Sequence, residues 1–256
     1  MEIVKGSIAI MGSGETSPAL VSVHRKFVEM LDNKVNAFLI DTPFGFQENA
    51  DVLVDKLQLF FKKSVQIEIK LASLRNTNNI DSVEYFEMLE QLKSSNFIFS
   101  GPGSPSYASK TWLHSEIPNV ITNHLKDGKN AVFSSAAAST LGEKTIPVYE
   151  IYKVGMTPFW EEGLNALELY GLSCTVVPHF NNKEGGNHDT SCSYIGKNRL
   201  NMLINEEYTN ILGIDEHTAL VINGEKEIFS VDGIGSVTVK TSNGQKVFEA
   251  GNEYSL

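Results

Sequence analysis

The sequence alternates between short apolar runs and segments in which apolar residues recur at helical spacing. One such segment places Leu20, Val23 and Phe27 on a single stripe, and another does the same with Val83, Phe86 and Leu89. Strands that alternate with helices build a largely parallel sheet with helices on both faces. The sequence therefore predicts an α/β fold, with buried strands near residues 7–11, 37–41, 65–70, 96–100, 130–134 and 173–177.

The sequence pattern changes after about residue 210, where apolar runs are short and separated by two-residue sequences typical of turns. Asn-Gly or Asp-Gly occurs at 223–224, 232–233 and 243–244, and these pairs favour tight hairpin turns. The C-terminal part should therefore consist of antiparallel β strands. We expect residues 1–256 to form a single α/β domain, with residues from about 210 to 256 as a β appendage.

The amino-acid composition limits which binding partners and which cellular compartment the protein can have. The chain has 21 Lys and Arg against 31 Asp and Glu, a net charge of −10, which argues against a nucleic-acid or anionic-membrane surface. Its two cysteines, Cys174 and Cys192, are too few for a disulfide framework, and no apolar run approaches the length of a membrane span. These features predict a cytoplasmic protein. The sequence leaves the oligomeric state open, with a homodimer as one candidate.

In a parallel sheet, ligands bind beyond the carboxyl ends of the strands, so we expect the functional residues in the loops that follow the strands. The loop 12–17 resembles the start of a dinucleotide fingerprint, but Ser17 stands where the third glycine belongs. Glu15 would also repel a pyrophosphate at the helix N-terminus. A tight structural turn is the better interpretation, and we predict no cofactor.

The run 133–140 places Ser135 between a predicted strand and a predicted helix, among alanines. A serine on such a sharp turn needs small neighbours, and the helix dipole favours a developing negative charge beside it. Ser135 is thus a candidate nucleophile, with the N–H of Ala136 directed toward an oxyanion. The alternative is a serine that merely caps a buried helix. Gly101 and Gly103 in the loop 100–107 suit an oxyanion hole or an ordinary turn equally well.

A serine nucleophile needs a base and an acid that orients the base. His179 directly follows a predicted strand, whereas His24, His114 and His124 fall in or beside helices and are most simply surface or half-buried residues. Glu150 and Glu216 both lie next to apolar runs and both qualify as the acid. Spacing alone does not choose between them.

Four segments together resemble the peptidase E and cyanophycinase family of serine peptidases. They are Ser-Ala-Ala-Ala at 135–138, His-Phe at 179–180, Arg-Leu at 199–200 and Gly-Ile-Asp-Glu-His-Thr-Ala-Leu at 213–220, and the likeness spans residues 7 to about 240. The resemblance implies a class I glutamine amidotransferase-like fold and a Ser-His-Glu triad without metal. Carried over, it assigns Ser135 as nucleophile, His179 as base and Glu216 as acid, with Gly101 and Ala136 amides as the oxyanion hole.

The chain departs from the family pattern at the active-site loops. Ala137 stands where the family usually has glycine, Pro102 removes one N–H donor, and most basic residues expected after the His-Phe pair are missing. Specificity for aspartyl bonds therefore does not transfer. The expected substrate is a small peptide or amide, and we select as candidate binding residues Gly103, Ser104, Lys183, Glu184, His188, Asp189 and Arg199.

Two other functions compete with a serine hydrolase. His179, Glu184, His188, Asp189 and His217 carry the imidazoles and carboxylates that a divalent metal prefers, although their spacing matches no zinc motif, and we predict no metal. The substitutions at the active-site loops also leave open a degenerate family member that binds a small molecule or partner without turnover.

Overall fold

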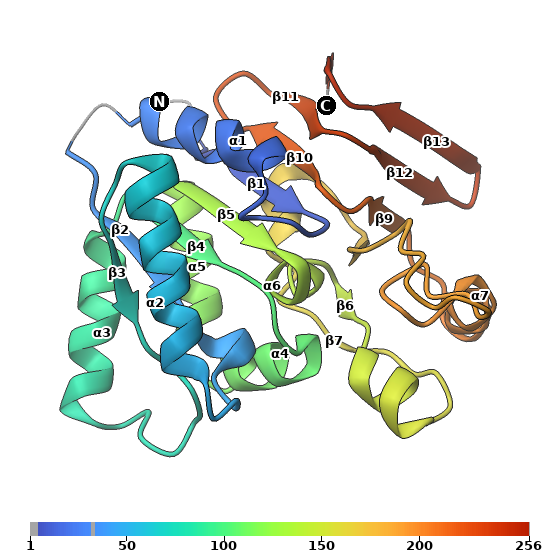
Figure 1. Cartoon of the computed structure of the whole chain (residues 1–256), viewed down its shortest axis with the longest axis horizontal. Coiled ribbons are helices and arrows are strands. Elements are labelled where there is room, and N and C mark those ends of the chain that lie inside the picture. Colours follow the sequence, from blue (N-terminus) through green and yellow to red (C-terminus); the bar gives the residue numbers. More distant parts are fainter. Residues whose placement is uncertain (1–4, 32–33, 256) are drawn as a thin grey trace.

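A mixed sheet of eight strands forms the centre of the protein (Figure 1). This computed structural model describes residues 5–31 and 34–255. Five strands run parallel in the order β1-β5-β4-β2-β3, and β10, β11 and β14 continue the sheet beyond β1 as antiparallel strands. Their bounds are β1 (Ile8–Met11), β5 (Asn130–Ser134), β4 (Phe97–Ser100), β2 (Ala37–Ile40), β3 (Ile69–Ala72), β10 (Thr218–Asn223), β11 (Ile228–Gly233) and β14 (Asn252–Ser255).

A second sheet has four strands in the order β13-β12-β9-β8. Its strands are β8 (Thr175–Val177), β9 (Ile211–Ile214), β12 (Ser236–Thr241) and β13 (Gly244–Glu249), and a separate pair joins β6 (Lys144–Thr145) to β7 (Glu161–Glu162). The predicted strand at 173–177 exists, but it pairs in parallel with β9 rather than joining the central sheet. The N–H of His179, two residues after β8, donates to the carbonyl of Gly12 after β1, which brings the two sheets together at their carboxyl ends.

Helices cover both faces of the central sheet. α1 (Pro18–Glu29) and α2 (Ala50–Phe60) pack on one face, while α3 (Val83–Ser94), α4 (Pro105–Leu113) and α5 (Ile117–Lys126) pack on the other. This arrangement confirms the predicted α/β class, its mostly parallel sheet and its C-terminal antiparallel strands. The remaining helical segments are η1 (Thr42–Phe44), η2 (Phe61–Val65), α6 (Ser135–Ser139), η3 (Glu150–Val154), η4 (Ala166–Tyr170) and α7 (Lys197–Glu206).

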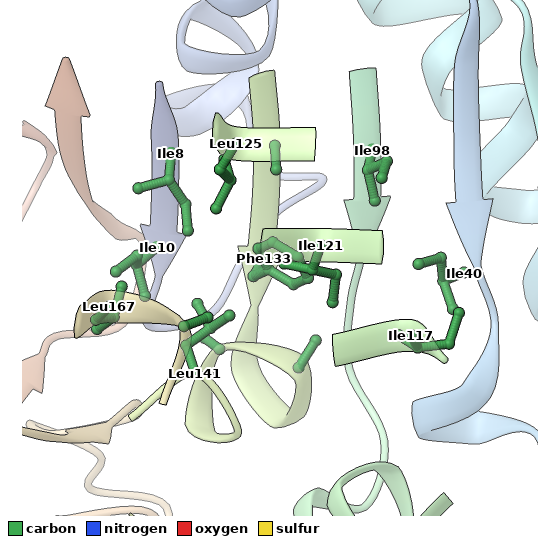
Figure 2. Packing of buried hydrophobic residues seen from close by; sticks show 14 of the residues in the cluster. Ile8, Ile10, Ile40, Ile98, Ile117, Ile121, Leu125, Phe133, Leu141 and Leu167 are labelled. Carbon is green, nitrogen blue, oxygen red and sulfur yellow. The ribbon is translucent and has the colours of Figure 1, made fainter. Parts of the chain in front are cut away.

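The two faces of the sheet are buried in separate cores because successive strand residues point in opposite directions. In β1, Ile8 and Ile10 contribute to one core, whereas Ala9 and Met11 contribute to the other. Figure 2 shows the first core, where side chains of α5 lie over those of β5, β4 and β2. Both faces are covered, so β1, β2, β4 and β5 are buried along their whole length and are mostly apolar, whereas the edge strand β3 exposes Lys70.

Two predicted boundaries differ from the structure. β3 begins at Ile69 rather than residue 65, because α2 continues into the π-helical turn η2, which ends at left-handed Gln66. The apolar stripe predicted for α3 is also wrong at its start, where Val83 and Phe86 are exposed and Tyr85 and Met88 take the buried positions.

The predicted exposure of two histidines is wrong. His24 and His124 are 0% and 3% exposed, and each ring binds a backbone carbonyl through Nε2, at 2.8 Å from Glu15 and 2.9 Å from Asn130. Helical spacing alone did not distinguish them from His114, which is exposed. Among the described residues, no helix is long and apolar enough to cross a membrane.

Candidate active site

Ser135 lies on a strained turn between β5 and α6. Its φ is +50°, in the left-handed region that non-glycine residues seldom adopt, at a cost of about 1–3 kcal/mol. Ala136 and Ala137 behind it are buried, so only small side chains fit there. The turn follows the carboxyl end of β5 directly. Ala137, at the position where the sequence resemblance led us to expect glycine, lies within α6.

His179 reaches Ser135 from the second sheet. Its Nε2 atom lies 2.8 Å from Oγ of Ser135. The residue also has a positive φ, +49°, and its ring packs 5.0 Å from the ring of Tyr194 between centroids. Contact with an aromatic ring and a side-chain exposure of 15% limit the access of water to the imidazole.

Glu216 occupies the other side of the imidazole. Its Oε1 lies 2.9 Å from Nδ1 of His179, and the same oxygen accepts a hydrogen bond from Nδ2 of Asn182 at 2.8 Å. The pKa of Glu216 is lowered, chiefly by the hydrogen bond with His179, while burial opposes the shift and Asn182 adds to it. A carboxylate bonded to Nδ1 holds the ring with Nε2 toward Ser135.

Glu150, the competing acid, is not part of this arrangement. It begins the π-helical segment η3, where its Oε1 accepts a hydrogen bond from the hydroxyl of Ser106 at 2.7 Å. The run around it therefore forms a helical turn rather than a strand. Of the two carboxylates that spacing left undecided, Glu216 is the one in contact with His179.

The loop after β4 is hydrogen-bonded to the start of α6, next to Ser135. The N–H of Ala137 donates to the carbonyl of Gly101 at 3.2 Å, which fixes the Gly101 peptide against the helix N-terminus. Ala136 and Gly103 line the adjoining cavity. Gly103 has a φ of +147°, and a Cβ there would lie 1.9 Å from the carbonyl oxygen of Pro43, so glycine is required for this loop path.

A cavity of about 460 Å³ opens beside Ser135 and His179. Three tyrosines, Tyr149, Tyr152 and Tyr194, contribute aromatic surface, and Lys153 and Glu184 contribute charges of opposite sign. A volume of this size suits a small ligand. The arrangement combines an oriented hydroxyl, an imidazole and a helix N-terminus at the mouth of one cavity, which is the set of groups that acyl transfer requires.

The model of peptidase family S51 matches residues 8–229. The chain belongs to this family. The resemblance predicted from the sequence is confirmed, and membership of the family supports a peptidase of the serine type. No curated protein matches the sequence.

Two solved structures share the fold of this S51 chain. A crystal structure of a peptidase from an acI-B1 actinobacterium gives a TM-score of 0.77 at 23% identity and covers 99% of this chain and 98% of its own. A protein from Listeria monocytogenes EGD-e assigned as a peptidase E gives 0.59 at 16% identity, covering 90% and 100%. At these identities the likeness shows a shared fold.

The predicted binding residues of the S51 chain fall into separate groups. Gly103 and Glu184 line the cavity beside Ser135, whereas Ser104 accepts a hydrogen bond from the N–H of Tyr107 as the N-cap of α4. Lys183 is exposed and lines neither this cavity nor its neighbour. The remaining three, His188, Asp189 and Arg199, line a neighbouring hollow that shares Tyr152 with the first.

Asp189 has a structural contact network. Its carboxylate accepts hydrogen bonds from Ser191 and from the N–H of Lys197 at the first turn of α7, and these bonds lower its pKa, the Ser191 side-chain bond most. His188 stacks on Tyr152 with centroids 6.1 Å apart. Among the described residues, no three His, Cys, Asp or Glu side chains gather as a metal site.

The sequence did not indicate that three tyrosines line the cavity, or that Asn182 contacts Glu216. Tyr149 and Tyr152 belong to the run around Glu150, and Tyr194 follows two residues that also have positive φ, Cys192 and Ser193. No local pattern distinguishes these tyrosines from core residues. Asn182 was visible only as a polar residue three positions after His179, a spacing that fits a turn returning to the histidine.

Proposed function

We propose that the protein is a serine peptidase that cleaves an amide or peptide bond of a small substrate. Ser135 is the nucleophile, His179 the general base and acid, and Glu216 the orienting acid. The observation that carries this proposal is the unbroken contact chain from Ser135 Oγ through both ring nitrogens of His179 to Glu216, beside a cavity, in a chain of peptidase family S51.

The reaction follows from these contacts. Oγ of Ser135 attacks the substrate carbonyl as Nε2 of His179 removes its proton. The tetrahedral intermediate collapses to an acyl-enzyme when His179 returns the proton to the leaving amine. Water then attacks the acyl group with His179 again acting as base, which releases the acid and restores Ser135. Glu216 keeps the proton on Nδ1 and stabilises the imidazolium that forms in each step.

Backbone amides supply the oxyanion hole in this proposal. The Ala136 amide lies at the positive end of α6, and the Gly101 residue, whose N–H is the second proposed donor, is held near the same helix because its carbonyl accepts a hydrogen bond from the Ala137 N–H. Preorganised donors of this kind lower the barrier by about 3–4 kcal/mol each. Gly103 lines the same cavity and lets its loop pass close to the Pro43 carbonyl.

The charged residues of the cavity position the substrate. Lys153, rather than Lys183 or Arg199, is the cation that lines the cavity beside Ser135, and we assign it to a substrate carboxylate. Glu184 faces the same space and suits an ammonium group. The protein acts in the cytoplasm, a reducing compartment that agrees with the two free, buried thiols of Cys174 and Cys192.

A hydrolysis assay with a panel of dipeptides, tripeptides and amino-acid amides tests the proposal. Wild-type protein should release free amines, and Ser135→Ala and His179→Ala should each reduce the rate to near background. Ser94→Ala, at an exposed serine of α3, serves as the matched control and should retain full activity. No hydrolysis of any substrate by the wild-type protein would favour a binding protein of the same fold.

A further inference from the structure

Two consecutive asparagines follow His179, and neither takes part in the proposed proton transfers. Both bind Glu216. Oδ1 of Asn181 accepts a hydrogen bond from the Glu216 backbone N–H at 2.9 Å, and Nδ2 of Asn182 donates to Oε1 of the Glu216 carboxylate at 2.8 Å. Asn181 is exposed, but Asn182 is only 1% exposed. A buried amide that bonds to a carboxylate is held in one geometry.

A single turn delivers two donors to the same oxygen. The N–H of Asn182 donates to the carbonyl of His179 at 3.2 Å and closes a turn between the two residues. Through this turn the imidazole and the Asn182 amide meet at Oε1 of Glu216, at 2.9 Å and 2.8 Å. The position of the acid therefore depends on the same segment that places the base.

The orientation of the Asn182 amide is fixed at both ends. Its Oδ1 accepts a hydrogen bond from the N–H of Glu184 at 3.1 Å. A backbone N–H requires an acceptor, so the oxygen faces Glu184 and the NH₂ group must face Glu216. The amide cannot turn over without placing two acceptors against each other at Oε1.

We propose that Asn182 is a positioning residue that holds the Glu216 carboxylate with Oε1 toward Nδ1 of His179. The inference rests on the proposed function. The Glu216 side chain is 25% exposed, so water competes for its oxygens. With Asn182 in place, Oε1 carries two protein donors in fixed directions. Without it, the imidazole is the one side-chain donor to this carboxylate among the residues that the structure describes, so the carboxylate rotates toward solvent and His179 loses its orientation.

The rate at which a fluorophosphonate inactivates Ser135 measures this role without a known substrate. Asn182→Ala removes the amide, while Asn182→Asp keeps the shape and the acceptor for the Glu184 N–H but has no donor at neutral pH. Both variants should be inactivated about tenfold or more slowly. Asn187→Ala, at an exposed asparagine of the same loop, is the control and should match the wild type.

Proton NMR separates positioning from mere support of the loop. The Nδ1 proton of His179 should give a far-downfield resonance that His179→Gln abolishes, and this resonance should shift or broaden in both Asn182 variants but not in Asn187→Ala. A wild-type protein that resists the fluorophosphonate would refute the proposed function, yet the NMR comparison would still decide the role of Asn182. Retention of the wild-type resonance in both Asn182 variants, or of the wild-type inactivation rate in Asn182→Asp, overturns the proposal.

Discussion

Two buried histidines should make the protein less stable as the solution becomes acidic. His24 lies among the rings of Phe60, Phe61 and Phe99, and burial lowers its pKa from 6.5 to about 4 despite the bond to the Glu15 carbonyl. Burial likewise lowers the pKa of His124 to about 4. Below pH 6.5 the unfolded chain binds protons at both rings, whereas the folded chain binds them only near pH 4. Because the unfolded state then carries more protons, stability must fall as the pH drops through this window.

The size of the effect follows from the two pKa values. A group whose pKa falls from 6.5 to about 4 on folding costs about 3 kcal/mol once the unfolded state is fully protonated, and about 2 kcal/mol already at pH 5. The two histidines together should therefore remove about 4 kcal/mol between pH 8 and pH 5, a large share of the stability of an ordinary domain. The lowered pKa of Glu216 contributes mainly below this window, because its unfolded pKa is near 4.5.

Urea unfolding at pH 8 and pH 5 measures this difference. In His24→Gln and His124→Gln the free-energy difference between the two pH values should shrink by about 2 kcal/mol each, even if the variants are less stable at both. His114→Gln is the matched control, because His114 is exposed and should leave the difference unchanged. Single variants that keep the full pH dependence of the wild type would refute the reasoning from burial.

Three further predictions concern the active-site loop, the acid and the domain organisation. Gly103→Ala should lower the free energy of unfolding by more than Gly171→Ala in urea titrations, because a Cβ at Gly103 meets the Pro43 carbonyl at 1.9 Å whereas one at Gly171 meets nothing within 4 Å; equal losses would contradict this. Glu216→Gln should reduce kcat/KM on any substrate found by about two to four orders of magnitude, since an amide no longer fixes the His179 tautomer, and a smaller loss would show that the carboxylate is dispensable. Calorimetry should give one cooperative transition for the whole chain, because the chain passes from β9 in the second sheet to β10 and β11 in the central sheet and then returns to β12 in the second sheet. Two separated transitions would contradict a single domain.

The elements that could be predicted from the sequence are the strands that are buried along their whole length. The apolar runs of β1, β2, β4 and β5 are buried on both faces, so their composition alone identifies them. The start of β3 was predicted too early because Val65, Ile67 and Ile69 alternate as in a strand, whereas Val65 belongs to the π turn that continues α2. The exposure of Val83 and Phe86 depends on which side of α3 meets the sheet, and helical spacing does not fix that side when apolar residues lie on both.

Some residues of the candidate site could likewise be predicted from the sequence, and others could not. Ser135 and His179 follow strands directly, so strand prediction placed them at the correct edge. The contact of Glu216 with His179 could be proposed only through the family resemblance, because it depends on β8 and β9 pairing in the second sheet. Tyr149 and Tyr152 reach the cavity from a helical segment between β6 and β7, and no local pattern encodes that approach.

The identity of the residue that a fluorophosphonate modifies tests the central claim most directly. Native protein should gain the mass of one adduct, and peptide mapping by mass spectrometry should find it on Ser135. Ser135→Ala should remain unmodified while keeping the wild-type melting temperature within a few degrees, since loss of one hydroxyl costs about 1 kcal/mol. A native protein that gains no adduct, or an adduct that persists in Ser135→Ala, would contradict the assignment of Ser135 as the nucleophile.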